Sequence, residues 1–255
     1  SNHNTNVRFA DNQMSTAGSL TDAGLVVQSW FGNKHAVVTT NDLSEASIRR
    51  CVEQSEVLAR LAPEDPEAMP LLERQQYQRV DAAYSTATEA IGAAERAQAA
   101  MTALGPTRRA GDLKAAGFLV MGAGATALAN SKGMFAYHRN TNVNYTLTVR
   151  TSDGTGSGWA AADHPDWRQI DFNRVSARAI EKARASRQPQ AVEPGRYTVI
   201  LEPQAVGDLV QLIAFYADAR QSDEGRSPFS KQGGGNKTGE KIVDERVTLF
   251  SDPSD

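Results

Sequence analysis

The sequence predicts an α+β protein with an N-terminal β-hairpin plus helices, a central antiparallel sheet packed with helices, and the beginning of a truncated third module. Two runs rich in β-branched and aromatic residues, 25–31 and 34–39, flank the turn dipeptide Gly32-Asn33. Residues 71–104 are rich in Ala, Glu, Gln and Arg and keep a near-helical apolar period. Residues 118–162 hold short Gly-, Ala-, Val- and Thr-rich segments between Asn, Gly and Ser clusters, a pattern typical of antiparallel strands.

The first module is predicted to span residues 1–64. After the hairpin, Asp42 and Glu45 resemble a capping box, and apolar residues then recur at helical spacing until Pro63. Cys51 falls on the apolar side of this helix, where a buried small side chain is expected because free cysteines are usually buried. Three prolines in residues 63–70 remove backbone donors and disfavour helix, so a module boundary is placed there.

The second module is predicted to span residues 65–192. It would contain one long helix over 71–104, with a break near Gly92, and then strands near 118–129, 134–139, 145–150 and 158–162. The glycines Gly122 and Gly124 would let another layer approach the sheet closely. A helix capped by Asp171 should follow, through about residue 187.

The third module is predicted to span residues 193–255. A turn at residues 193–195 leads into a strand over 196–201, and the apolar segment 205–219 reads as a helix buried on more than one side. The sequence after Gly239 reads as another strand. The chain starts without methionine and stops in a polar string, so both ends are expected to be cut.

Charge and composition exclude several classes of function. The 27 basic and 30 acidic residues give a net charge of −3, without the basic field that attracts nucleic acid. The single cysteine cannot close an intrachain disulfide, which favours a reducing compartment, and the cytoplasm is the expected location. No run approaches the roughly 18 apolar residues of a membrane helix, and no signal peptide is recognisable. Neither nucleic acid nor a membrane is expected as a partner.

The local motifs indicate neither a catalytic residue nor a metal ligand. The four histidines do not form a His-Glu-x-x-His zinc motif. Asp163, His164 and Asp166 group three possible ligands, but Pro165 between them more simply indicates a turn. A metal site built from His138, His164 and a ligand beyond the C-terminus is the remaining alternative. The glycine run at 233–235 lacks the strand-to-helix context and the glycine before lysine of a phosphate-binding loop.

Short sequence segments that have no role in the motifs above occur along nearly the whole chain. They include Arg8-Phe9-Ala10, Asn130-Ser131-Lys132-Gly133, Glu193-Pro194-Gly195, Leu201-Glu202-Pro203 and Thr238-Gly239-Glu240-Lys241. Together these segments resemble the TldD/PmbA family. The resemblance implies a three-module cytosolic protein of a metallopeptidase family that is linked with proteolysis, peptide-antibiotic maturation, toxin–antitoxin turnover and modulation of DNA gyrase.

The zinc-peptidase branch of that family carries His-Glu-x-x-x-His on the helix after the segment that resembles Leu201-Glu202-Pro203. Counting without gaps from Pro203 places Gln211, Leu212 and Tyr216 at the motif positions, and none of the three can bind zinc or activate water as the motif does. This departure resembles the PmbA branch. It implies a subunit with no cofactor of its own, whereas the active branch uses zinc, and whether this chain hydrolyses peptides itself is left open.

The implied partners are peptides or unfolded protein segments, together with a second subunit in a homodimer or in a heterodimer with a TldD-like chain. Exposed strand edges in the antiparallel sheet could add an extended peptide through backbone hydrogen bonds. The alternative is a non-catalytic structural, assembly or peptide-binding module, in which the sheet and the long helix serve subunit contact.

Overall fold

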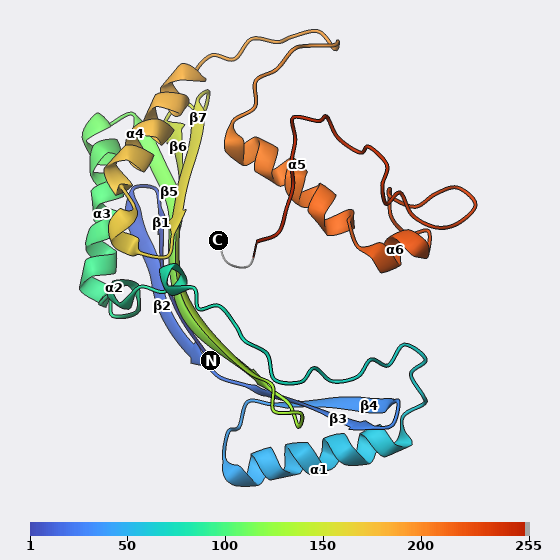
Figure 1. Cartoon of the computed structure of the whole chain (residues 1–255). Helices are drawn as coiled ribbons and strands as arrows, with labels where there is room; N and C mark the ends of the chain where they lie inside the picture. The colour runs from blue at the N-terminus through green and yellow to red at the C-terminus, as the bar shows by residue number, and fades with distance from the viewer. Residues whose placement is uncertain (253–255) are drawn as a thin grey trace. The chain divides into compact units, whose positions relative to one another are not determined.

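The structure is a computed structural model that describes residues 1–252, so that residues 253–255 at the end of the predicted third module lie outside the description. The described residues divide into two compact units, one formed by residues 1–190 and the other by residues 191–252. Helices and antiparallel strands both contribute to the fold (Figure 1), which confirms the predicted α+β class.

A five-stranded antiparallel sheet is the centre of residues 1–190, with the strand order β2-β1-β5-β6-β7. The strands are β1 (Asn2–Ala10), β2 (Gln13–Asp22), β5 (Leu113–Ala129), β6 (Phe135–Thr151) and β7 (Ser157–His164). The predicted antiparallel sheet is therefore confirmed. The two segments expected near 134–139 and 145–150 form a single strand, because β6 pairs with β5 without interruption along its whole length.

The first two strands were not predicted. Asp11 and Asn12 join them with positive φ angles of 48° and 63°, the conformation that a tight hairpin turn requires. The side chain of Asn12 then fixes this turn to β5: its Nδ2 donates to the carbonyl of Leu113 at 2.8 Å, and its Oδ1 accepts from the backbone N–H of Ala115 at 2.7 Å. One asparagine thereby ties the hairpin to the middle strand of the sheet.

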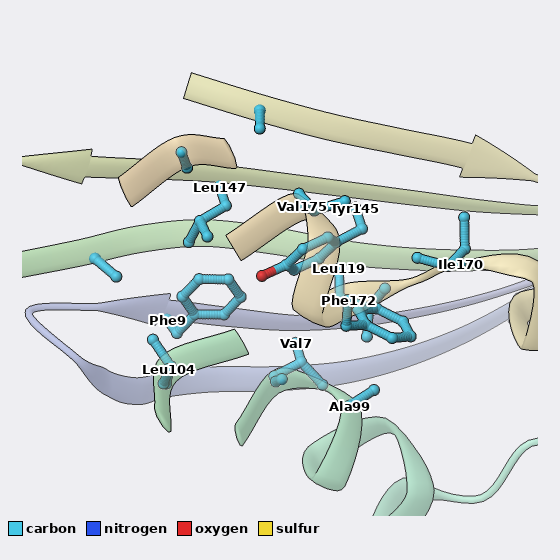
Figure 2. Close-up of a cluster of buried hydrophobic side chains, with 14 of the residues drawn as sticks. Val7, Phe9, Ala99, Leu104, Leu119, Tyr145, Leu147, Ile170, Phe172 and Val175 are labelled. Atoms are coloured by element: carbon cyan, nitrogen blue, oxygen red, sulfur yellow. The ribbon is translucent and has the colours of Figure 1, made fainter. Parts of the chain in front are cut away.

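Helices cover one face of this sheet (Figure 1). They are α2 (Thr86–Glu89), α3 (Ala93–Ala110) and α4 (Phe172–Ala185), with the short 3₁₀ turns η1 (Asp81–Ala83) and η2 (Trp167–Gln169). The core between the layers is drawn in Figure 2. Its largest fully buried side chains include Phe9, Leu104, Leu113, Leu119, Met121, Tyr145 and Leu147.

The long helix predicted over 71–104 is wrong in its first half. Residues 71–80 have no regular structure and are almost all exposed, so this segment has no apolar face to pack, and composition alone rarely stabilises a helix in water. The helix begins after Gly92, where a break was expected, and its N-cap backbone N–H donates to Glu95. It also continues through Pro106 to Ala110, since Leu104 and Thr107 are buried in this last part.

The remaining predicted elements of residues 1–190 are present. β3 (Leu25–Phe31) and β4 (Lys34–Thr40) form the expected hairpin, against which α1 (Glu45–Leu61) packs. The capping residue of α1 is Ser44, whose side chain accepts from the backbone N–H of Ser47. Asp42, the expected cap, instead accepts from the backbone N–H of Ser44, before the helix begins. Cys51 is buried, as expected.

The helix predicted from Asp171 is α4. Asp171 accepts from Arg174 N–H and caps it. Gly156, in the connection from β6 to β7, and Gly158, in β7, both lie against this helix. A Cβ on Gly158 would lie only 2.2 Å from the carbonyl oxygen of Ala179, so only glycine lets the helix backbone approach β7 this closely.

Residues 191–252 contain the helices α5 (Pro203–Tyr216) and α6 (Ala219–Asp223). The strands predicted over 196–201 and after Gly239 are wrong, because these described segments find no strand partner and an isolated run is not stable as a strand. The expectation that the helix over 205–219 is buried is also wrong. In this described part only Ser222 is buried, and the exposed side chains of α5 include Val206, Leu209, Leu212 and Phe215.

Candidate functional site

The three positions singled out in the sequence lie together on α5. Pro203 at the first helical position starts this helix, since its missing N–H has no intrahelical partner there in any case. Leu212 and Tyr216, four residues apart, share one face, whereas Gln211 lies about 140° around the axis from Tyr216. Leu212 is 56% exposed and Tyr216 38% exposed, and Gln211 is exposed as well. The site therefore presents an amide, an alkyl group and a phenol to its surroundings.

The C-terminal end of α5 is held by neighbouring residues of the same unit. Ser227 Oγ donates to the carbonyl of Tyr216 at 2.7 Å, and the Phe215 and Tyr216 rings meet edge to face with centroids 5.2 Å apart. Ile213, on another side of the helix, lines a cavity of about 520 Å³ together with Phe229 and residues of the 236–249 segment. Gln211, Leu212 and Tyr216 do not line this cavity.

The two histidines of the alternative metal site lie at different levels of the sheet. His164 pairs with Val143 of β6, whereas His138 lies five residues along that strand and pairs with Thr126. Five strand residues correspond to about 17 Å. Among residues 1–252, no group of three His, Cys, Asp or Glu side chains is arranged to hold a metal ion.

Asp163 and His164 end β7, and the chain bends at Pro165 and Asp166, where His164 and Asp166 have local hydrogen-bond partners. His164 Nδ1 lies 2.9 Å from the backbone N–H of Asp166, which donates to it. The Asp166 carboxylate accepts from the guanidinium of Arg168 at 2.6 and 3.0 Å and from the backbone N–H of Arg168 at 3.0 Å. These hydrogen bonds from Arg168 lower the pKa of Asp166 to about 2.

The Asp166 carboxylate should make a small, pH-dependent contribution to stability. Because its folded pKa is depressed below the ordinary carboxyl value, the contribution is present above that value and is lost as pH falls toward about 2. We expect Asp166→Asn to melt at a slightly lower temperature than wild type at neutral pH, and the difference to shrink as pH falls from about 5 to about 2. Thermal melts at several pH values measure it, with Asp163→Asn as the neighbouring control. A difference that stays constant with pH would contradict the assignment.

A second cavity of about 440 Å³ lies between residues 78–84 and β6. The guanidinium of Arg139 stacks over the Tyr84 ring at 3.7 Å from its centroid, and the Tyr84 hydroxyl donates to the Glu89 carboxylate. That hydrogen bond raises the pKa of Tyr84. This grouping could not be predicted from the sequence, because its members come from two segments about fifty residues apart.

Comparison with protein-family models accounts for nearly the whole chain. The PmbA/TldA metallopeptidase domain 1 matches residues 1–59, the central domain matches residues 81–187, and the C-terminal domain matches residues 194–255. The chain belongs to the PmbA/TldD metallopeptidase family. The segment that matches the C-terminal domain of PmbA/TldD proteins includes α5, and with it Gln211, Leu212 and Tyr216.

Solved structures share this PmbA/TldD fold at low sequence identity. A proposed modulator of a DNA gyrase from Thermotoga maritima aligns with a TM-score of 0.75 and 14% identity, over 89% of this chain and 52% of that one. A proposed DNA gyrase modulator from Bacteroides thetaiotaomicron gives 0.72 and 12%, over 88% and 52%. TldE from Thermococcus kodakarensis gives 0.64 and 14%, over 72% and 42%. This chain thus spans about half the length of these structures or less.

The search of curated protein sequences gives no significant match. Among residues 1–252, no helix has both the length and the apolar character that crossing a membrane demands.

Proposed function

We propose that this chain is a PmbA-like subunit that takes part in peptide processing without a zinc site of its own. The observation that carries the proposal is the set of side chains at the motif positions on α5. An amide at Gln211 is a poor zinc ligand, Leu212 cannot transfer protons, and a phenol at Tyr216 would be an unusual replacement for imidazole. Catalysis in the assembled protein would then rest with a TldD-like partner, in a heterodimer, or with residues outside this helix.

Peptides or unfolded segments are the proposed ligands of this subunit. The strand order supports this, because β2 and β7 are the edge strands and each has only one neighbour among the described strands. β6 extends past β7 as well: β7 pairs with residues 143–150, so residues 135–142 have a strand neighbour on one side only. An extended peptide can add to such an edge by backbone hydrogen bonds, which tolerate many sequences.

Zinc content and peptide cleavage test the proposal directly. After dialysis, the purified protein is expected to hold zinc well below one ion per chain, and any cleavage of a fluorogenic peptide should be unaffected by a chelator. The triple variant Gln211→His, Leu212→Glu, Tyr216→His, which carries the motif residues, is the matched control and is expected to retain more zinc than wild type because imidazole is a better zinc ligand than an amide or a phenol. Stoichiometric zinc with chelator-sensitive cleavage in the wild-type protein would overturn the proposal.

The second candidate function is a non-catalytic assembly module. The exposed apolar side chains of α5 favour it, since a row of this kind commonly marks a protein–protein contact. Sedimentation at several concentrations, with and without a TldD-like subunit, separates the two candidates when combined with the cleavage assay. Assembly that leaves the partner's peptide cleavage unchanged would favour the structural role, whereas assembly that raises cleavage would favour the processing role.

A further inference from the structure

The sheet face opposite the helices carries two matched rows of asparagine. Asn2, Asn4 and Asn6 occupy alternate positions of β1, and Asn140, Asn142 and Asn144 occupy alternate positions of β6. Strand register places a residue of β5 between each pair: Asn2 and Asn140 flank Gly124, Asn4 and Asn142 flank Gly122, and Asn6 and Asn144 flank Val120. Two strands more than 130 residues apart therefore present the same side chain at the same level.

These asparagines point away from the protein core. Successive strand residues alternate between the two faces, and the intervening residues Val7, Val143 and Tyr145 are buried against the helical layer. Asn2, Asn4, Asn140 and Asn142 are exposed, and Asn6 and Asn144 are half-buried. The rows thus lie on the face that α2, α3 and α4 leave uncovered (Figure 1).

Four of the amide groups, those of Asn2, Asn4, Asn140 and Asn142, lean inward over the glycines of β5, whereas the amide of Asn6 lies beside Gly18 of β2. A Cβ on Gly122 would lie 2.4 Å from Asn142 Oδ1 and 2.8 Å from Asn4 Oδ1. A Cβ on Gly124 would lie 2.8 Å from Asn2 Oδ1 and 3.1 Å from Asn140 Oδ1. The glycines were expected to admit another layer of the fold, but the space above them is occupied by these side chains. The result is a continuous strip of primary amides, which we call the asparagine strip: Asn2, Asn4, Asn6, Asn140, Asn142 and Asn144.

The strip conflicts with ordinary strand preferences. Asparagine and glycine are both depleted in strands, so this block lowers the intrinsic stability of the sheet. Beyond Asn144, the same face of β6 carries Thr146, Thr148 and Arg150 in place of asparagine. Side chains other than asparagine can therefore occupy this face of the strand. A confined patch of residues that disfavour the local secondary structure typically marks a functional surface.

We propose that the asparagine strip binds the backbone of an extended polypeptide that lies along β5 on the open face. A primary amide offers one acceptor oxygen and two donor hydrogens, which match the N–H and C=O of a peptide bond. Same-facing residues repeat about every 6.8 Å along an antiparallel strand, and an extended peptide repeats its backbone groups with the same period. Two rows can therefore hold both sides of one backbone. This inference rests on the proposed role in peptide processing and specifies where the peptide would bind.

Binding by neutral amides has recognisable properties. The amides contact the backbone of the peptide and not its side chains, so peptides of many sequences should bind. It also depends little on ionic strength, because no charged group of the strip takes part.

The experiment uses the 255-residue chain and a fluorescein-labelled decapeptide of alternating Ser and Val, with affinity measured by fluorescence anisotropy. The double variant Asn4→Thr, Asn142→Thr removes two amides that face each other. We expect it to bind the peptide about tenfold more weakly, since two neutral hydrogen bonds are lost. Its melting temperature should be unchanged or higher, because threonine favours strands. The control variant Thr148→Ser, on the same face of β6 outside the strip, should bind like wild type.

A second probe tests the backbone contacts. The same peptide with alternate residues N-methylated lacks half of its N–H donors, and it should bind wild type no more tightly than the unmodified peptide binds the double variant. If the double variant binds the unmodified peptide as wild type does, the strip is not the site, and peptide handling through strand edges stands. If wild type binds neither peptide, the proposed peptide-processing role and this inference both fail.

Discussion

Replacing Phe9 by alanine is expected to lower the free energy of unfolding of the protein by about 3–5 kcal/mol. Phe9 is 1% exposed and lies in the core between β1 and α3 (Figure 2). Its ring covers Gly117 of the neighbouring strand, where a Cβ would lie 2.6 Å from the ring, and its centroid lies 6.2 Å from that of Tyr145. Alanine would leave a cavity that the glycine opposite cannot fill. Urea denaturation followed by circular dichroism measures the loss.

Leu20→Ala on the neighbouring edge strand is the matched control for this prediction. Leu20 is 66% exposed, so its truncation should change the free energy of unfolding by no more than about 0.5 kcal/mol. Equal losses for Phe9→Ala and Leu20→Ala would contradict the placement of Phe9 in the core.

The second large effect is expected from Gly158→Ala, which should destabilise the protein by about 3 kcal/mol. The added methyl group would lie 2.2 Å from the carbonyl oxygen of Ala179 and 2.5 Å from the backbone nitrogen of Ala183. Both atoms belong to the backbone of α4, so no side chain can rotate to make room, and the helix must move away from β7. Urea denaturation again provides the measurement.

Gly24→Ala provides the comparison for that substitution. There the nearest atom to an added Cβ is the Thr40 carbonyl oxygen at 3.5 Å, an ordinary contact, and the backbone φ is not in the left-handed region. A change within about 0.5 kcal/mol is expected. A mild effect of Gly158→Ala, comparable to that of Gly24→Ala, would show that α4 does not lie so close to β7.

The sequence predicted those elements whose local signals agree with their tertiary environment. The hairpin around Gly32 and the helix capped by Asp171 carry turn and capping residues that act within a few positions, so they could be located from the sequence alone. β1 and β2 could not, because asparagines and small polar residues replace the strand formers on which prediction depends. The run over 196–201 has the opposite property: it is rich in strand formers, but no described strand pairs with it.

The candidate site was predictable only in part. Gln211, Leu212 and Tyr216 could be placed on one helix because apolar spacing and Pro203 define it, but their exposure could not be foreseen from an apolar sequence that reads as buried. The asparagine strip was missed although its signal is visible as Asn at alternate positions near both 2–6 and 140–144. Only the register of β1 and β6 on either side of β5 shows that the two patterns meet.

The position of β1 inside the sheet has a consequence for biosynthesis. Phe9 pairs opposite Gly117, so β1 acquires its inner neighbour β5 only after more than a hundred further residues have been translated. At ordinary translation speeds of about 5–20 residues per second, that delay is about 5–20 s. Throughout it, the apolar side of the nascent β1–β2 hairpin has no covering layer. The side chains of Val7 and Phe9 therefore stay uncovered on the ribosome-bound chain until β5 emerges.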